Sequence, residues 1–144
     1  MRDSELIMAG TVSSGVDVGL RISASGATNG SYDIDTLAAG DAIKSGAIFK
    51  CLATQILAGT GTTVTITLVT CAENTFGSAT TLFSSGAIAK AATGAGTVLC
   101  QTVIPVGVLR YLRVIFTTDN TMETTGRISA WIALNPDKTL DKQL

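Results

Sequence analysis

Few residues of this chain could do nucleophilic or acid–base chemistry. The 144 residues include no histidine, so a serine or threonine nucleophile would need a lysine or a carboxylate as its base. Glu73, Asp119 and Glu123 lie in predicted loops, where a glycosidase places its paired carboxylates. Loop acids also commonly do no more than solvate turns. The sequence therefore favours a protein that is not an enzyme.

Two further patterns could bind ligands. Asp33, Asp35 and Asp41 could offer oxygen ligands to Ca²⁺, but Asp33 and Asp35 alternate along a predicted strand and equally fit its solvent face. The GxG fragments at residues 59–61 and 94–96 have no GKT or GKS after them, so they do not predict phosphate binding. We expect neither a metal nor a cofactor.

The three cysteines, Cys51, Cys71 and Cys100, are widely spaced, and each lies in apolar strand sequence. A zinc site would call for CxxC pairs or histidine partners, which the sequence lacks. We expect three free, mostly buried thiols in a protein that folds in a reducing cytoplasm. The first six residues do not have the basic start and apolar core of a secretory signal.

The composition argues against nucleic-acid and membrane partners. The net charge is −1, so no overall field attracts nucleic acid or an anionic membrane surface. No apolar run approaches the ~20 residues of a spanning helix. Only 15% of residues are charged, against about 25% in typical soluble domains. This low charge predicts a surface that other subunits partly cover.

Most of the chain reads as strands that alternate apolar and polar residues. Residues 62–70 place Val64, Ile66 and Leu68 on one face and threonines on the other, which is the pattern of a half-buried strand. Residues 110–116 and 127–134 repeat it. With turn signals between such segments, the sequence predicts an all-β, jelly-roll-like two-sheet sandwich of about eight antiparallel strands.

We divide the chain into an irregular, extended segment at residues 1–45, a sandwich at 46–136 and a polar tail at 137–144. The first segment could form an ordinary hairpin, or it could run over the sandwich or a neighbouring subunit. We expect residues 1–14 to be removable without unfolding the core. Residues 86–93 are ambiguous between strand and helix, because their alanine-rich sequence favours a helix but is short for one.

Two aromatic residues could form contact faces. Trp131 alternates with Ile128, Ala130 and Ile132, so it lies either on an outer surface or in a strand that is buried on both faces. Tyr111 stands opposite Leu112, Val114 and Phe116 in the same way.

Several segments resemble, in order and spacing, the capsid cement (decoration) proteins of tailed bacteriophages, of the Bordetella-phage type. The similar segments are Ala58-Gly59-Thr60-Gly61, Val64-Thr65-Ile66-Thr67-Leu68-Val69-Thr70, Ser78-Ala79-Thr80-Thr81-Leu82, Ser85-Gly86-Ala87-Ile88-Ala89, Arg110-Tyr111-Leu112-Arg113 and Thr124-Thr125-Gly126-Arg127-Ile128-Ser129-Ala130-Trp131. They span about residues 45–136; residues 15–40 look longer and more irregular than such proteins have.

The resemblance implies a jelly roll that binds the major capsid protein on the outside of the virion and associates with itself, as a trimer. The alternative is a receptor- or carbohydrate-binding sandwich, as in a fibre or adhesin head. The candidate contact residues are Leu6, Ile7, Met8, Asn74, Phe76, Tyr111, Asn120, Met122 and Trp131.

Overall fold

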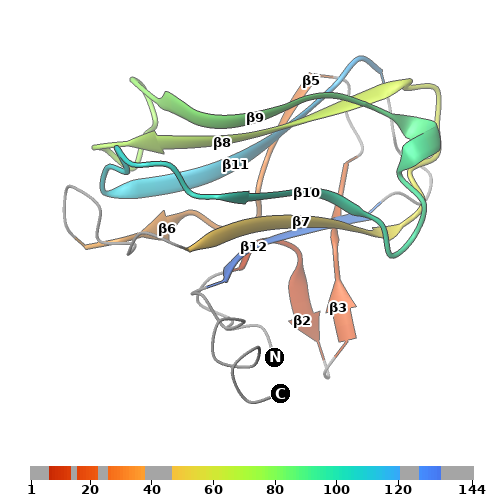
Figure 1. The fold of residues 1–144 in the computed structure, drawn as a ribbon, viewed down its shortest axis with the longest axis horizontal. Coiled ribbons are helices and arrows are strands. Elements are labelled where there is room, and N and C mark those ends of the chain that lie inside the picture. Colours follow the sequence, from red (N-terminus) through yellow and green to blue (C-terminus); the bar gives the residue numbers. More distant parts are fainter. Residues whose placement is uncertain (1–6, 14–15, 23–25, 38–46, 121–126, 134–144) are drawn as a thin grey trace.

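The computed structural model describes residues 7–13, 16–22, 26–37, 47–120 and 127–133 (Figure 1). These residues form strands, together with a short 3-10 helix at Lys90–Ala92. The strands are β1 (Ile7–Ala9), β2 (Thr11–Ser13), β3 (Val16–Val18), β4 (Leu20–Arg21), β5 (Gly26–Asn29), β6 (Ile34–Asp35), β7 (Ile48–Gln55), β8 (Thr63–Cys71), β9 (Thr80–Ala89), β10 (Val98–Val103), β11 (Tyr111–Thr118) and β12 (Arg127–Ala133). No helix among the described residues is long and apolar enough to cross a membrane.

Two antiparallel sheets pack face to face. In the β12 sheet the order is β1-β12-β7-β10, with β4 also beside β12; in the β11 sheet it is β5-β11-β8-β9, with β6 also beside β11. β1 and β4 pair with successive parts of β12, and β5 and β6 with successive parts of β11. Together, β1 and β4 occupy one edge position beside β12, and β5 and β6 occupy one edge position beside β11. With the single strands β7 to β12, the sandwich therefore has eight strand positions.

Numbered along the chain, the eight positions lie in the orders 1-8-3-6 and 2-7-4-5. These orders are those of a jelly roll, in which two Greek keys form the two sheets. The predicted all-β, jelly-roll-like sandwich is therefore confirmed.

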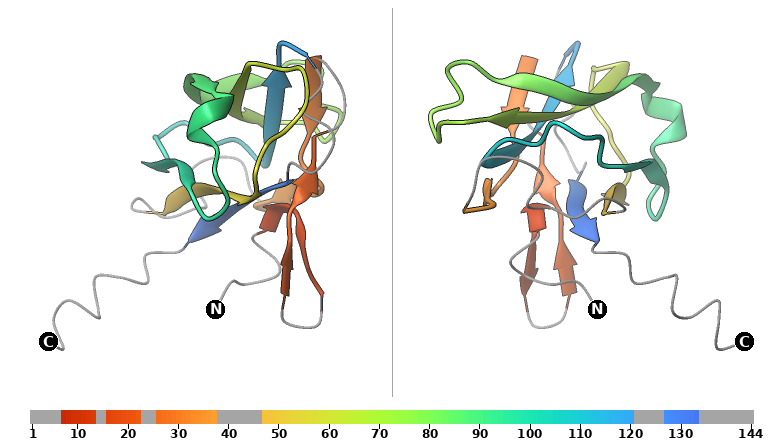
Figure 2. Two further views of the ribbon diagram at one scale, coloured as in Figure 1. Left: turned by 90° about the vertical axis from the view of Figure 1, so that its right-hand side faces the viewer. Right: turned by 60° about the vertical axis from the view of Figure 1, so that its left-hand side comes forward.

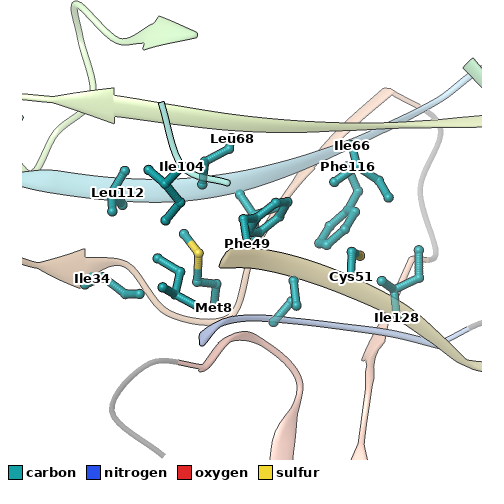
Figure 3. Packing of buried hydrophobic residues seen from close by; sticks show 14 of the residues in the cluster. Met8, Ile34, Phe49, Cys51, Ile66, Leu68, Ile104, Leu112, Phe116 and Ile128 are labelled. Carbon is teal, nitrogen blue, oxygen red and sulfur yellow. The ribbon is translucent and has the colours of Figure 1, made fainter. Parts of the chain in front are cut away.

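The core lies between the two sheets (Figure 3). Its residues are the alternate apolar side chains that the sequence predicted. Val64, Ile66 and Leu68 of β8 are buried, whereas the threonines between them are only half-buried on the outer face. Leu112, Val114 and Phe116 of β11 lie beside them in the same sheet. The residues that face them from the opposite sheet come from β7 and β12: Phe49, Cys51, Ile128, Ala130 and Ile132.

The ambiguous segment at residues 86–93 is mostly strand. β9 continues through Gly86 to Ala89, and only the next three residues form a 3-10 helix. Ala87, Ile88 and Ala89 pair with the start of β8, so ladder hydrogen bonds outweigh the helical preference of the alanines. Gly86 has a φ of +69° and lies beside a register shift in this ladder, where a residue with a side chain would be strained.

The N-terminal third contributes to the sandwich itself. The sequence did not predict β1, β2, β3 or β5. β2 and β3 form a hairpin that projects away from the two sheets (Figure 2). β1, in contrast, lies at the edge of the β12 sheet, and Met8 is 0% exposed within the core. The expectation that residues 1–14 lie outside the core is therefore wrong at Ile7–Ala9. The predicted polar tail lies outside the described residues.

Candidate protein-contact surface

One group of charged and aromatic side chains lies on the outer face of the β11 sheet, at the end where β11 begins and β6 and β8 end. We call it the Arg–aromatic cluster. Its members come from the turn before β6, from β6, from the β8–β9 loop and from the start of β11: Asp33, Asp35, Phe76, Arg110, Tyr111 and Arg113.

Two bidentate ion pairs hold the cluster together. Arg110 Nε and Nη2 donate to the two carboxylate oxygens of Asp35, both at 2.9 Å. Arg113 Nε and Nη2 donate to Asp33 at 2.8 and 2.7 Å. The hydrogen bonds that Arg110 donates lower the pKa of Asp35, and the hydrogen bonds that Asp33 accepts raise the pKa of Arg113. These pairs are partly exposed and add little to stability, but they fix the planes of both guanidinium groups.

The fixed guanidinium groups stack on the aromatic rings. Arg113 Cζ lies 4.0 Å from the centre of the Phe76 ring, and Arg110 Cζ lies 5.0 Å from that of Tyr111. The two rings meet edge to face at 6.5 Å. The structure thus brings together Phe76 and Tyr111, which the sequence proposed as separate contact residues. Asn74 is exposed in the same loop as Phe76.

The backbone at this end of the sandwich is strained at two positions. Among the described residues, the non-glycine residues with positive φ are Leu37, at 65°, and Phe76, at 55°. Such values are rare for bulky side chains and tend to occur at functional sites. Hydrogen bonds enforce both: Leu37 N–H donates to Asp35 Oδ1 at 2.8 Å, and Phe76 N–H donates to the Glu73 carbonyl at 3.2 Å.

The strained turn leaves Leu37 81% exposed. Val106, in the connection from β10 to β11 at the same end, is also 81% exposed. Two large apolar side chains are therefore exposed at the same end of the sandwich as the charge-balanced Arg–aromatic cluster. This combination of aromatic, arginine and apolar groups is typical of protein–protein contacts.

Sequence reasoning interpreted the charged members of the cluster differently. In the sequence, Asp33 and Asp35 were possible calcium ligands or residues on the solvent face of a strand. In the structure an arginine engages each of these carboxylates, and Asp41 lies outside the described residues. Within those residues no three His, Cys, Asp or Glu side chains gather to hold a metal ion. The opposite charges on the β6 segment and β11 were a usable signal, but only the strand register shows that they meet.

The loop after β11 lies at the other end of the same sheet. Asp119 accepts hydrogen bonds from the backbone N–H groups of Thr62 and Thr63, at 2.8 and 3.1 Å, and from the Thr62 hydroxyl. These bonds lower the pKa of Asp119 to about 2. Asn120 is exposed beside it, and Met122 lies outside the described residues. The length of β8 separates this end from Phe76 by roughly 25–30 Å, so the two groups of candidates form no single patch.

Trp131 lies on the outer face of the opposite sheet. Its strand neighbours Ile128, Ala130 and Ile132 are buried in the core, whereas Trp131 is half-buried. Lys50, across the ladder on β7, places Nζ 5.9 Å from the centre of the Trp131 ring. Of the two alternatives for Trp131, the structure shows the outer surface.

Three candidate contact residues, Leu6, Ile7 and Met8, lie near the N-terminus. Leu6 lies outside the described residues. Met8 is a core residue, so its side chain is not available to a partner, and Ile7, opposite Trp131, is also buried. This burial could not be predicted from the sequence, because the short β1 has too few residues to show a period.

Of the comparisons with known proteins, a match to a family model is informative. No curated protein matches the chain. A family model, Bbp16, matches residues 16–132, and this family consists of Bordetella phage proteins. The match runs from β3 into β12 and so includes most of the jelly roll and every member of the Arg–aromatic cluster. Because it covers well over half of the sequence, the chain belongs to the Bbp16 family of phage proteins.

Proposed function

We propose that this protein is a structural component of a phage virion. It binds the major capsid protein on the outer surface of an icosahedral shell and stabilises that shell against the pressure of the packaged genome. The observation that carries the proposal is the match to a phage protein family across most of the jelly roll. The resemblance of the strand segments to capsid cement proteins supports the same role.

The Arg–aromatic end is the surface that we propose for contact with the shell. Arginine and aromatic residues are enriched among the side chains that dominate binding energy. Here the ion pairs already hold these side chains in place, so binding costs little side-chain entropy. Leu37 and Val106, both highly exposed, supply apolar groups that a partner would remove from water.

Shell reinforcement does not require a tight single contact. Each copy bridges neighbouring capsid subunits, and self-association, as a trimer, links several such contacts. When one contact opens, the others hold the released site close by, which raises its effective concentration. A rigid sandwich suits this role, because a load on one end is carried through continuous ladders such as β8 against β11.

The test is direct binding to shells. Purified protein is mixed with shells assembled from the major capsid protein alone, and bound copies are separated by sedimentation. We expect saturable co-sedimentation at a fixed number of copies per shell, with light scattering of the free protein giving its oligomeric state. A protein that stays in the supernatant at every concentration contradicts the proposal. Binding to host cells in its place would favour the receptor-binding alternative.

A further inference from the structure

We propose that Cys51 and Cys100 form a reactive pair of thiols, which a small-molecule disulfide converts into a cross-strand disulfide between β7 and β10. The inference does not rest on the proposed function. It rests on the register of two strands, on the different exposure of the two thiols and on the position of β10 at a sheet edge.

The register places the two cysteines directly opposite each other. Cys100 of β10 is the ladder partner of Cys51 of β7, and both side chains pack into the core. Opposite residues of an antiparallel pair have Cα atoms about 4.5–5.5 Å apart, within the range of about 4.4–6.8 Å that a disulfide spans. Both cysteines are free thiols in this structure.

The third cysteine has a different environment. Cys71 is buried near the end of β8, where its ladder partner is Tyr111. Its neighbours in the ladder are not cysteines, so it serves as an internal control for the reactivity of an isolated thiol.

The two thiols differ in exposure and in pKa, and this difference determines which thiol reacts first. Cys100 lies on an edge strand and is half-buried, whereas Cys51 lies on an interior strand and is fully buried. The hydrogen bond from Cys51 lowers the pKa of the Cys100 thiol, and burial raises the pKa of the Cys51 thiol. Cys100 is therefore the attacking thiol, because the thiolate is the nucleophile and it must reach its target.

The reaction is two thiol–disulfide exchanges. The Cys100 thiolate attacks one sulfur of the small disulfide, whose S–S bond breaks, and the released thiolate takes up the proton that Cys100 lost. Cys51 then loses its proton and attacks the Cys100 sulfur, expelling the second small thiolate, which takes up that proton. In total the protein loses two hydrogens, and one small disulfide becomes two thiols.

β10 has the freedom to close this bond. Among the residues that the structure describes, it pairs only with β7, and its register shifts between Val98 and Cys100. An edge strand with a bulge next to the reacting residue can move locally without disturbing the other sheet. The disulfide would then tie this edge strand to the interior of the sheet.

Oxidised glutathione is the probe. Native protein is incubated with it, excess reagent is removed, and free thiols are counted after denaturation in a disulfide-free buffer. We expect the count to fall from the three cysteines of the sequence to one. The intact mass should decrease by two hydrogens, with no glutathione retained, and a non-reducing digest should link the peptides of Cys51 and Cys100.

Three variants identify the roles. Cys71→Ala should still lose two thiols, leaving none. Cys51→Ala should retain one glutathione on Cys100, because no second thiol can expel it, and Cys100→Ala should not react in the native state. The proposal is overturned if the wild-type protein keeps three thiols under conditions that oxidise the unfolded chain. It is equally overturned if the wild-type protein retains glutathione on Cys100, or if the digest links Cys71.

Discussion

Replacing Met8 with alanine is expected to lower the free energy of unfolding by about 2–5 kcal/mol, the usual cost of truncating a large buried side chain. Met8 is 0% exposed in the core, and its carbonyl accepts a hydrogen bond from the Tyr32 N–H at 3.1 Å. Gly30 packs so closely against this carbonyl that a side chain would not fit there. Chemical denaturation followed by tryptophan fluorescence measures the change.

Met8→Leu is the matched control. It keeps the apolar volume and should cost less than about 1.5 kcal/mol. Equal denaturation midpoints for Met8→Ala and the wild-type protein would show that the N-terminal strand is not part of the stable sandwich. Residues 1–14 could then be removed without unfolding the core, as the sequence predicts.

Long alternating strands could be predicted from sequence, whereas short ones could not. β8, β11 and β12 have seven to nine residues each, and buried positions alternate with more exposed ones along the whole of β11 and the first part of β8. Segments of this length and pattern indicate both the strand and its buried face. β1, β2, β3 and β5 have three or four residues each. In so short a segment the pairing partner decides the structure, and the sequence does not contain that information.

The candidate surface could not be predicted for the same reason, because its residues are brought together only by the pairing of distant strands. Asp33 and Arg113 are 80 residues apart, and Asp35 and Arg110 are 75 apart. Phe76 reaches the cluster because its loop folds back onto β11 with a left-handed residue, which nothing in its local sequence indicates. The aromatic residues could therefore be predicted as candidates. Their contacts with the ion-paired arginines could not be predicted.

The double substitution Leu37→Asp with Val106→Asp is expected to reduce binding to shells by at least about 100-fold. Burying a large apolar side chain contributes about 1.5–3 kcal/mol, and each 1.4 kcal/mol is tenfold in affinity. Both side chains are 81% exposed in the free protein, so the substitutions should leave the unfolding midpoint nearly unchanged. Co-sedimentation over a range of concentrations gives the affinity.

Ile56→Asp is the control for this experiment. Ile56 is also a large exposed apolar residue, at 57%, but it follows β7 at the opposite end of the sandwich. We expect it to bind shells like the wild-type protein. A loss of binding with Ile56→Asp, while the double variant binds normally, would place the contact at the Asp119 end.

The heat stability of genome-filled particles tests the central claim most directly. Particles made without this protein are compared with complete particles in a temperature series, with a DNA-binding dye reporting genome release. We predict that particles without the protein release their genome at a clearly lower temperature. Adding purified wild-type protein should restore the higher temperature, and the Leu37→Asp, Val106→Asp variant should not. If both kinds of particle release the genome at the same temperature, the protein does not stabilise the shell.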